Sequence, residues 1–306
     1  MTTFVIRRLL WTIPVLLLVI LFTFLMMRQI KGNPFRKTDR AVPAAIQANL
    51  DRKFHLDEPW YVQYADYVKG VFSLDLGPSL VLRNQSVNDI VKSHFPVSLE
   101  LGAYAFLFAI VAGVPLGMLA ALRANKLSDY LAMLVANVGF AVPSFLVATL
   151  LIYYFAVKWN VGLPTSGWRS WDSKILPSIA LGFFPMAYFA RLVRGTMLET
   201  LQQDYVRTAK AKGVGQREVL FVHALKNAAV PIITIIGNGV ALLIGGAVIT
   251  ESVFAIPGLG RLTVDAILRR DYPVIQGVVL LFSFSYVLVN LAVDLTYTLF
   301  DPRIRY

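Results

Sequence analysis

The sequence predicts an all-α membrane protein with six transmembrane helices. Of its 306 residues, 57% are hydrophobic and only 15% are charged, whereas an ordinary soluble domain is about 25% charged. The apolar residues gather in six segments, most of which reach the roughly 20 residues needed to cross about 30 Å of hydrocarbon. The chain has no cysteine, which excludes a thiol nucleophile, a disulfide and a Cys-ligated metal.

We expect one transmembrane domain over residues 1–306. The expected spans are residues 9–27, 101–122, 130–157, 175–190, 228–250 and 274–298. The first exceeds the roughly 7–15 apolar residues of a signal peptide and lacks a small-residue cleavage pattern, which predicts an uncleaved anchor. In the second, Gly113 and Gly117 have the small-xxx-small spacing that favours close helix packing. Prolines within spans indicate packing kinks or breaks that line a pathway.

Six spans place both termini on one side of the membrane, and the basic residues decide which side. The short segments on the side of the termini are the richer in Lys and Arg, with seven basic residues between Arg191 and Lys226 alone. The positive-inside rule therefore predicts cytoplasmic termini and a cytoplasmic segment over residues 191–227. Residues 28–98 form an extracytoplasmic loop, which is long enough to escape the rule. The net charge of +11 is explained by basic residues that orient the spans and contact anionic lipid headgroups, so it does not indicate nucleic-acid binding.

The extracytoplasmic loop is expected to be partly helical. Its aromatic residues Trp60, Tyr61, Tyr64 and Tyr67 recur at helical spacings. They predict either an interfacial belt or small core of the loop, or a docking surface for an external partner.

The motifs of several enzyme classes are missing from the sequence. It has no G-x-x-x-x-G-K-[ST] phosphate loop and no H-E-x-x-H, and His55, His94 and His223 are scattered. We therefore expect no catalytic residue, no metal site and no cofactor bound by this chain. Asp294 lies near the cytoplasmic end of the last span, where a structural partner explains it better than proton coupling.

The cytoplasmic segment has the pattern of a helix, a glycine turn and a second helix. Val206, Ala209 and Gly213 fall on one helical face, and basic residues lie on the others. This pattern alone is equally typical of an amphipathic helix on headgroups and of a contact for a partner protein.

Several motifs in this order resemble permease subunits of binding-protein-dependent ABC importers. The coupling region of that family, the EAA loop, has the pattern Glu-Ala-Ala, then three residues, then Gly. Here Arg207-Thr208-Ala209 precedes Gly213 at this spacing. Arg207 replaces the glutamate, a departure that is common in the dipeptide/oligopeptide (Dpp/Opp) branch. Four further matches follow downstream, at His223, Leu225, Asn227 and Pro231. The segments GGAVITESVFAIPGLGRL and DPRIRY also resemble that branch, most closely its first, B-type permease, and the resemblance covers essentially the whole chain.

This resemblance implies a type I ABC importer permease fold without catalytic residues. It implies a second, homologous permease subunit, two ATPase subunits that hold ATP and magnesium, and an extracytoplasmic solute-binding protein, in a prokaryotic cytoplasmic membrane. Val206, Ala209 and Gly213 would supply apolar and close-approach contacts to an ATPase, and the charged residues its rim. The implied coupling residues are Val206, Arg207, Thr208, Ala209, Lys210, Lys212, Gly213 and Arg217.

The implied function is coupling of ATP hydrolysis by partner subunits to uptake of peptides or a related solute, such as an oligosaccharide. The alternative is a secondary carrier or channel that works without ATPase subunits. The near absence of ionisable groups within the spans disfavours a proton-coupled carrier. The weak pathway candidates are polar residues of the spans, and interhelical hydrogen bonding also explains them. They are Asn137, Ser144, Asn238 and Ser283.

Overall fold

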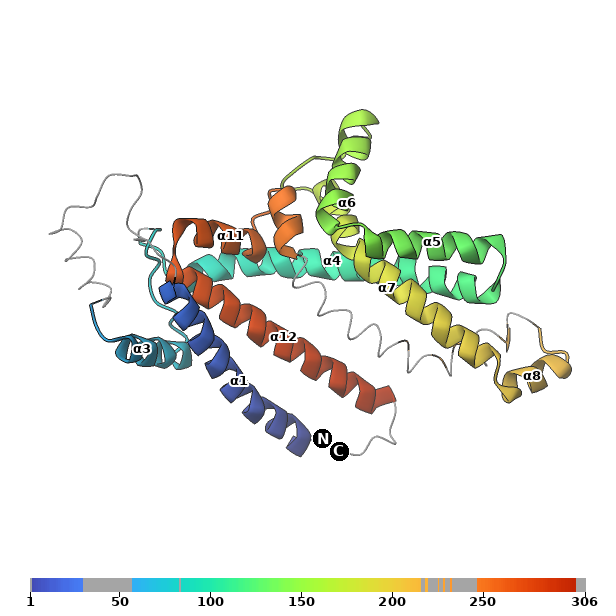
Figure 1. The fold of residues 1–306 in the computed structure, drawn as a ribbon, viewed down its shortest axis with the longest axis horizontal. Coiled ribbons are helices and arrows are strands. Elements are labelled where there is room, and N and C mark those ends of the chain that lie inside the picture. Colours follow the sequence, from blue (N-terminus) through green and yellow to red (C-terminus); the bar gives the residue numbers. More distant parts are fainter. Residues whose placement is uncertain are drawn as a thin grey trace. The chain divides into compact units, whose positions relative to one another are not determined.

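A computed structural model describes residues 2–29, 57–82, 84–215, 218, 219, 225, 228, 232 and 247–300 (Figure 1). The chain divides into two compact units, each of which is described by itself. Unit 1 comprises Met1–Val97 and Pro257–Val287, and unit 2 comprises Ser98–Ile256 and Leu288–Tyr306. The described residues are mainly helical, and their β pairing is limited to one bridge between Pro78 and Ser86.

The main helices are α1 (Thr2–Gln29), α3 (Trp60–Phe72), α4 (Val87–Leu122), α5 (Leu127–Ala141), α6 (Ser144–Leu151), α7 (Ile175–Leu201), α8 (Asp204–Ala211), α11 (Leu259–Arg269) and α12 (Tyr272–Phe300). A π-helical turn, Ile152–Lys158, extends α6, and a 3₁₀ turn, Asp172–Lys174, precedes α7.

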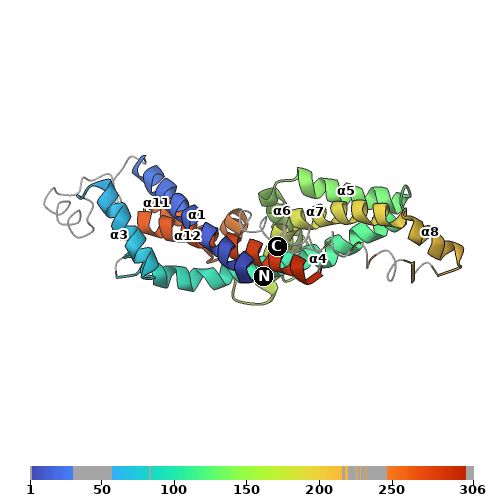
Figure 2. The ribbon, with the colours of Figure 1, turned by 90° about the horizontal axis from the view of Figure 1, so that it is seen from below.

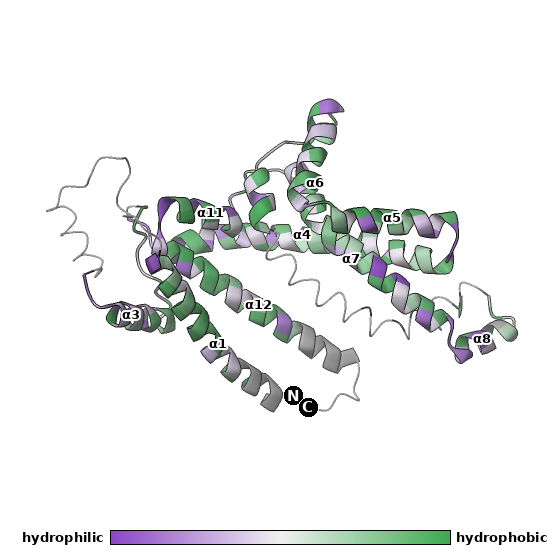
Figure 3. Ribbon diagram, viewed as in Figure 1, coloured by the Kyte–Doolittle hydropathy of each residue, from purple (hydrophilic) through white to green (hydrophobic). Residues whose placement is uncertain are grey.

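Four described helices are long and apolar enough to cross a membrane: Leu10–Gln29, Val87–Leu122, Asp172–Leu201 and Tyr272–Ala292. A fifth candidate is the pair Leu127–Ala141 and Ser144–Lys158, which bends by 110° at Pro143. Figure 3 shows the apolar character of α1, α5 and α12. Most of the expected span 228–250 lies outside the described residues. These helices are compatible with six spans.

Two helices extend beyond the apolar segments that predicted them. Helix α4 begins at Val87 instead of residue 101, because Ser86 caps it: the Ser86 Oγ accepts from the Asp89 N–H (3.1 Å) and donates to the Asp89 carboxylate (2.6 Å). Helix α7 runs to Leu201 instead of ending at residue 190. Its added turns are stabilised by the fully buried Val193 and Met197.

In unit 1, helix α3, which lies in the segment predicted to form an extracytoplasmic loop, packs on α1. The Tyr64 hydroxyl donates to the Leu17 carbonyl (3.2 Å), and the Tyr64 ring lies edge-on to Phe24 at 5.9 Å. Tyr64 therefore helps to attach α3 to α1. The Tyr67 hydroxyl is buried without a hydrogen-bond partner among the described residues, and this burial raises its pKa. Trp60 and Tyr61 remain exposed, so a docking role for them stays a prediction.

In unit 2, helices α4, α5 and α7 pack closely, and Figures 1 and 2 both show α5 alongside α7. A Cβ added to Gly113 or Gly117 would lie less than 3 Å from the carbonyl oxygen of Met186 or Ala190 in α7. This confirms the close packing predicted from the glycine spacing. On the other side, a Cβ on Gly139 of α5 would lie 2.5 Å from the Ala187 Cβ.

Candidate functional site

The predicted coupling residues form a short helix directly after α7. A tight turn at Gln202 and Gln203 separates Leu201 from α8, and the Gln203 carbonyl accepts the first amide hydrogen bonds of α8, from Val206 (3.0 Å) and Arg207 (3.1 Å). At the other end, Gly213 has a φ of +79°, a left-handed conformation that stops the helix and favours glycine. The chain thus builds α8 as a separate element with defined ends.

The apolar face of α8 points into the protein. Val206 is 0% exposed and Ala209 is 7% exposed, and both pack with Val219, Leu201 and Val214. The resemblance implied contacts with an ATPase subunit for these two side chains, and those contacts stay a prediction. In the structure they attach α8 to its own chain.

The opposite face of α8 carries the exposed predicted residues. Arg207 has 72% of its side chain exposed and lies 3.8 Å from the Asp204 carboxylate. Thr208, Lys212 and Gly213 are also exposed, whereas the side chain of Lys210 and all of Arg217 lie outside the description. Tyr205, which sequence reasoning missed, is 41% exposed at the edge of the buried face, on the other flank of the helix from Arg207. The available signal was its position next to Val206, about 100° around the helix.

The described pathway candidates fall in two units, each of which is described by itself. In unit 2, the Asn137 Oδ1 accepts from Arg191 Nη2 at 2.6 Å, an interhelical bond between α5 and α7. Ser144 starts α6 directly after Pro143. Ser283, in unit 1, donates to the Val279 carbonyl of its own helix (2.8 Å). Asn238 lies outside the described residues, and so do the side-chain contacts of Asp294.

A charged network that sequence reasoning missed lies at the start of α7. The Glu100 carboxylate accepts hydrogen bonds from Lys174 Nζ (2.5 Å), Trp168 Nε1 (2.8 Å) and the Tyr104 hydroxyl (3.0 Å). Lys174 Nζ also lies 5.4 Å from the Trp168 ring centre and 5.7 Å from that of Tyr104. These contacts fix the connection before α7 to α4.

A second missed charge pair, Asp129 with Arg194, joins the start of α5 to α7. Asp129 is buried and Arg194 is partly exposed, and the pair lies within two turns of the end of α7. Within the described ranges, no three His, Cys, Asp or Glu side chains group as metal ligands.

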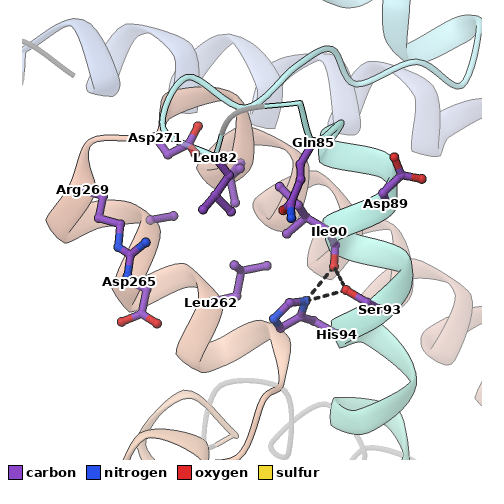
Figure 4. Close-up of a pocket in the computed structure, with 12 residues that line it drawn as sticks. Leu82, Gln85, Asp89, Ile90, Ser93, His94, Leu262, Asp265, Arg269 and Asp271 are labelled. Carbon is purple, nitrogen blue, oxygen red and sulfur yellow. Dashed lines mark hydrogen bonds between the residues drawn. The ribbon is translucent and has the colours of Figure 1, made fainter. Parts of the chain in front are cut away.

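Unit 1 contains an open pocket of about 400 Å³ between the first turns of α4 and helix α11 (Figure 4). Leu262 and Ile90 contribute apolar surface, and Asp89 and Asp265 lie at its two edges, on α4 and α11. His94 Nδ1 lies 2.7 Å from the Ile90 carbonyl, so this nitrogen is the protonated one. The predicted topology places the pocket on the extracytoplasmic side.

Comparisons with known proteins agree with the resemblance. The family described as binding-protein-dependent transport system inner membrane component matches residues 113–306, and the N-terminal family of such membrane components matches residues 1–102. The chain is 44% identical over 306 residues to the dipeptide transport system permease protein DppB of Bacillus subtilis, covering 100% of this chain and 98% of that protein. It is 41% identical to the oligopeptide transport system permease protein OppB of Haemophilus influenzae, with 100% of both chains covered.

Solved structures show the same fold at low sequence identity. The inward-facing MetNI methionine ABC transporter matches with a TM-score of 0.60 and 17% identity, over 69% of this chain and 96% of that chain. An amino acid ABC transporter with histidines matches with a TM-score of 0.55 and 17% identity, over 71% of this chain and 94% of that chain. With two family profiles that together cover nearly the whole chain, the protein belongs to the binding-protein-dependent transport system inner membrane components, in the branch of the dipeptide and oligopeptide ABC permeases.

Proposed function

We propose that this permease imports short peptides or a related solute, and that α8 is the element on which partner ATPase subunits act. A second permease subunit completes the pathway, and an extracytoplasmic solute-binding protein delivers the solute. ATP and magnesium belong to the ATPase subunits, and this chain contributes no catalytic residue. The relatives named for dipeptide and oligopeptide transport support the solute class.

The observation that carries the proposal is the two-sided construction of α8. Val206 and Ala209 fasten the helix to the chain's own apolar cluster, while Tyr205 and Arg207 stand outward. A helix that is attached on one face and exposes an aromatic ring and a cation on its two flanks can receive a partner and transmit its movement. Tyrosine and arginine are the residue types enriched among the strongest contacts of protein interfaces.

The proposed mechanism is a biased two-state element. ATP-driven closure of the ATPase subunits displaces α8, and the short Gln202–Gln203 turn passes the displacement to α7. The pathway then changes between inward-facing and outward-facing arrangements. Exposed cations such as Arg207 and Lys212 steer the encounter and set its salt dependence. This assignment requires α8 and both termini to be cytoplasmic.

The test uses the complete complex, purified in lipid nanodiscs with its ATPase subunits. Tyr205→Ala and Arg207→Glu are expected to leave membrane insertion unchanged but to lower solute-stimulated ATP hydrolysis about tenfold, the loss expected when a central contact worth roughly 1.4 kcal/mol is removed. Arg123→Glu, at an exposed residue of another predicted cytoplasmic turn, serves as the charge-reversal control. Normal stimulation in both α8 variants would refute the role of α8.

Two further observations separate this function from a carrier or channel that works alone. An ATPase pair is expected to copurify with the chain, and uptake is expected to require ATP; uptake by the isolated chain along an ion gradient would contradict the proposal. Because the chain has no cysteine, the variant Asn84→Cys reports topology. An impermeant thiol reagent is expected to label it from the extracytoplasmic side, and labelling only from the cytoplasmic side would overturn the orientation.

A further inference from the structure

We infer that Asp129 and Arg194 are a positioning pair that makes α5 follow α7 when α8 is displaced. The inference rests on the function proposed above, because it concerns how a displacement of α8 is transmitted to the helices α5 and α7. It assigns a role to two charged residues that lie outside the family's coupling motif.

The geometry of the pair is that of a two-point clamp. Arg194 Nε donates to Asp129 Oδ1 at 2.6 Å, and Arg194 Nη2 donates to Oδ2 at 2.7 Å. The Asp129 side chain is only 2% exposed and that of Arg194 is 27% exposed. The Asn125 N–H also donates to Asp129 Oδ2 at 2.9 Å. One carboxylate therefore holds α7, the start of α5 and the turn before α5 together.

The pair lies close to the place where the proposed displacement arrives. Arg194 precedes the end of α7 at Leu201 by about two helical turns. Helix α8 begins at Asp204, directly after the Gln202–Gln203 turn. A movement of α8 therefore reaches Arg194 through a short stretch of continuous helix.

Different faces of α7 hold α4 and α5, and they do so in different ways. Toward α4, Val193 and Met197 are buried in one apolar cluster with Ala121. Toward α5, the close backbone approach is at Ala187 and Gly139, about two turns farther from α8 than Arg194. The Asp129–Arg194 clamp thus extends the α5–α7 contact toward the end of α7 on which α8 acts.

The chemistry of the clamp suits positioning better than simple adhesion. Burying two charges is costly, so a buried ion pair is weak evidence for stability, and apolar residues of similar volume often hold helices as well. A bidentate guanidinium–carboxylate pair, however, fixes both the distance and the relative orientation of its partners. Apolar side chains allow neighbouring helices to slip, whereas this pair resists slip in two directions.

The first test measures coupling in the reconstituted complete complex. Arg194→Lys keeps the charge but loses the two-point fork, and Asp129→Asn keeps the shape but loses the charge. Both are expected to lower the amount of solute imported per ATP hydrolysed about twofold to thirtyfold, the range for residues that modulate coupling between distant sites. Arg123→Gln, which removes an exposed cation from the same turn, is expected to keep the wild-type ratio. A normal ratio in both pair variants would show that the pair is only a structural anchor.

The second test does not depend on whether those variants assemble. The double variant Gly139→Cys/Ala187→Cys places two thiols on α5 and α7 in a chain that has no other cysteine. The Cβ atoms start 2.5 Å apart, and a disulfide needs about 3.8 Å, so the helices must part by only about 1.3 Å. If α5 follows α7, oxidation forms the bond and leaves ATP-driven uptake unchanged.

Two results of the second test would overturn the inference. Uptake that stops on oxidation and returns with reductant would mean that α5 and α7 must separate during transport. Uptake that is already lost in the reduced double variant, while a Gly139→Ala control keeps it, would likewise mean that transport depends on movement at this contact. Failure of the proposed function is recognised separately, because in that case the wild-type complex itself shows no ATP-driven uptake.

Discussion

Replacing Val206 by alanine tests whether α8 is held by its inner face. Val206 is fully buried, in a small cluster with Ala209 and Val219. The substitution removes two methyl groups at about 0.8 kcal/mol each, hence about 1.6 kcal/mol before any cavity cost. That loss corresponds to an approximately fifteenfold larger population of the undocked helix.

Native-state hydrogen exchange of the α8 amides, measured in nanodiscs without the ATPase subunits, reports this population directly. Val206→Ala is expected to accelerate their exchange about fifteenfold. The matched control is Arg207→Ala on the same helix, where 72% of the side chain is exposed; there a surface substitution is expected to change stability by less than about 0.5 kcal/mol, or roughly twofold. Equal acceleration in both variants, or a larger effect for Arg207→Ala, would refute the inward attachment of α8.

Three further substitutions test other contacts. Gly213→Ala places a β-carbon at a φ of +79° and is expected to destabilise the end of α8 by about 1–2 kcal/mol. Trypsin should therefore cleave this segment faster. Asparagine tolerates this backbone conformation, so the control Gly213→Asn should be cleaved at the wild-type rate. Gly117→Ala forces a Cβ against an α7 carbonyl and is expected to lower stability by about 1–3 kcal/mol in thermal unfolding. The control is Gly102→Ala, where nothing lies within 4 Å of the added Cβ. Equal melting temperatures of the two variants would contradict close packing at Gly117. Lys174→Met leaves Glu100 without its cation and is expected to cost about 0.5–1.5 kcal/mol, because Glu100 is partly exposed and keeps its bonds from Trp168 and Tyr104. Unchanged unfolding would mean that the cation contributes nothing to stability.

The parts of the fold that were predictable are those encoded by nearby residues. Apolar segments predicted the long helices because the bilayer imposes a length and a composition on each span. The spacing of Gly113 and Gly117 predicted a close helix contact, since residues four apart share a face. The alternation around Val206 predicted that α8 has a distinct small-residue face, although its direction, toward the chain's own cluster, depends on Val219 and was not deducible.

The start of α4 shows a local signal that hydropathy conceals. Ser86 and Asp89 form a capping pair, and the S-x-x-D pattern is readable in the sequence. A hydropathy reading finds where a chain enters hydrocarbon, whereas the cap marks where the helix itself begins. The two differ whenever a helix continues outside the membrane.

The polar contacts between helices were not predictable because they depend on how helices face one another. Asp129 and Arg194 are 65 positions apart, and Glu100 and Lys174 are 74 positions apart. Helical periodicity gives the face of each residue but not the neighbour that the face meets. Only tertiary structure pairs these residues.

The bend at Pro143 has a consequence for the lipid around this protein. The Val138 carbonyl still accepts from the Val142 N–H at 2.9 Å, but the next carbonyl, that of Gly139, has lost its donor four residues on because proline has no N–H. Hydrocarbon offers that oxygen no hydrogen bond, so protein or water must cover it. The bend therefore marks a patch of α5 from which acyl chains are excluded.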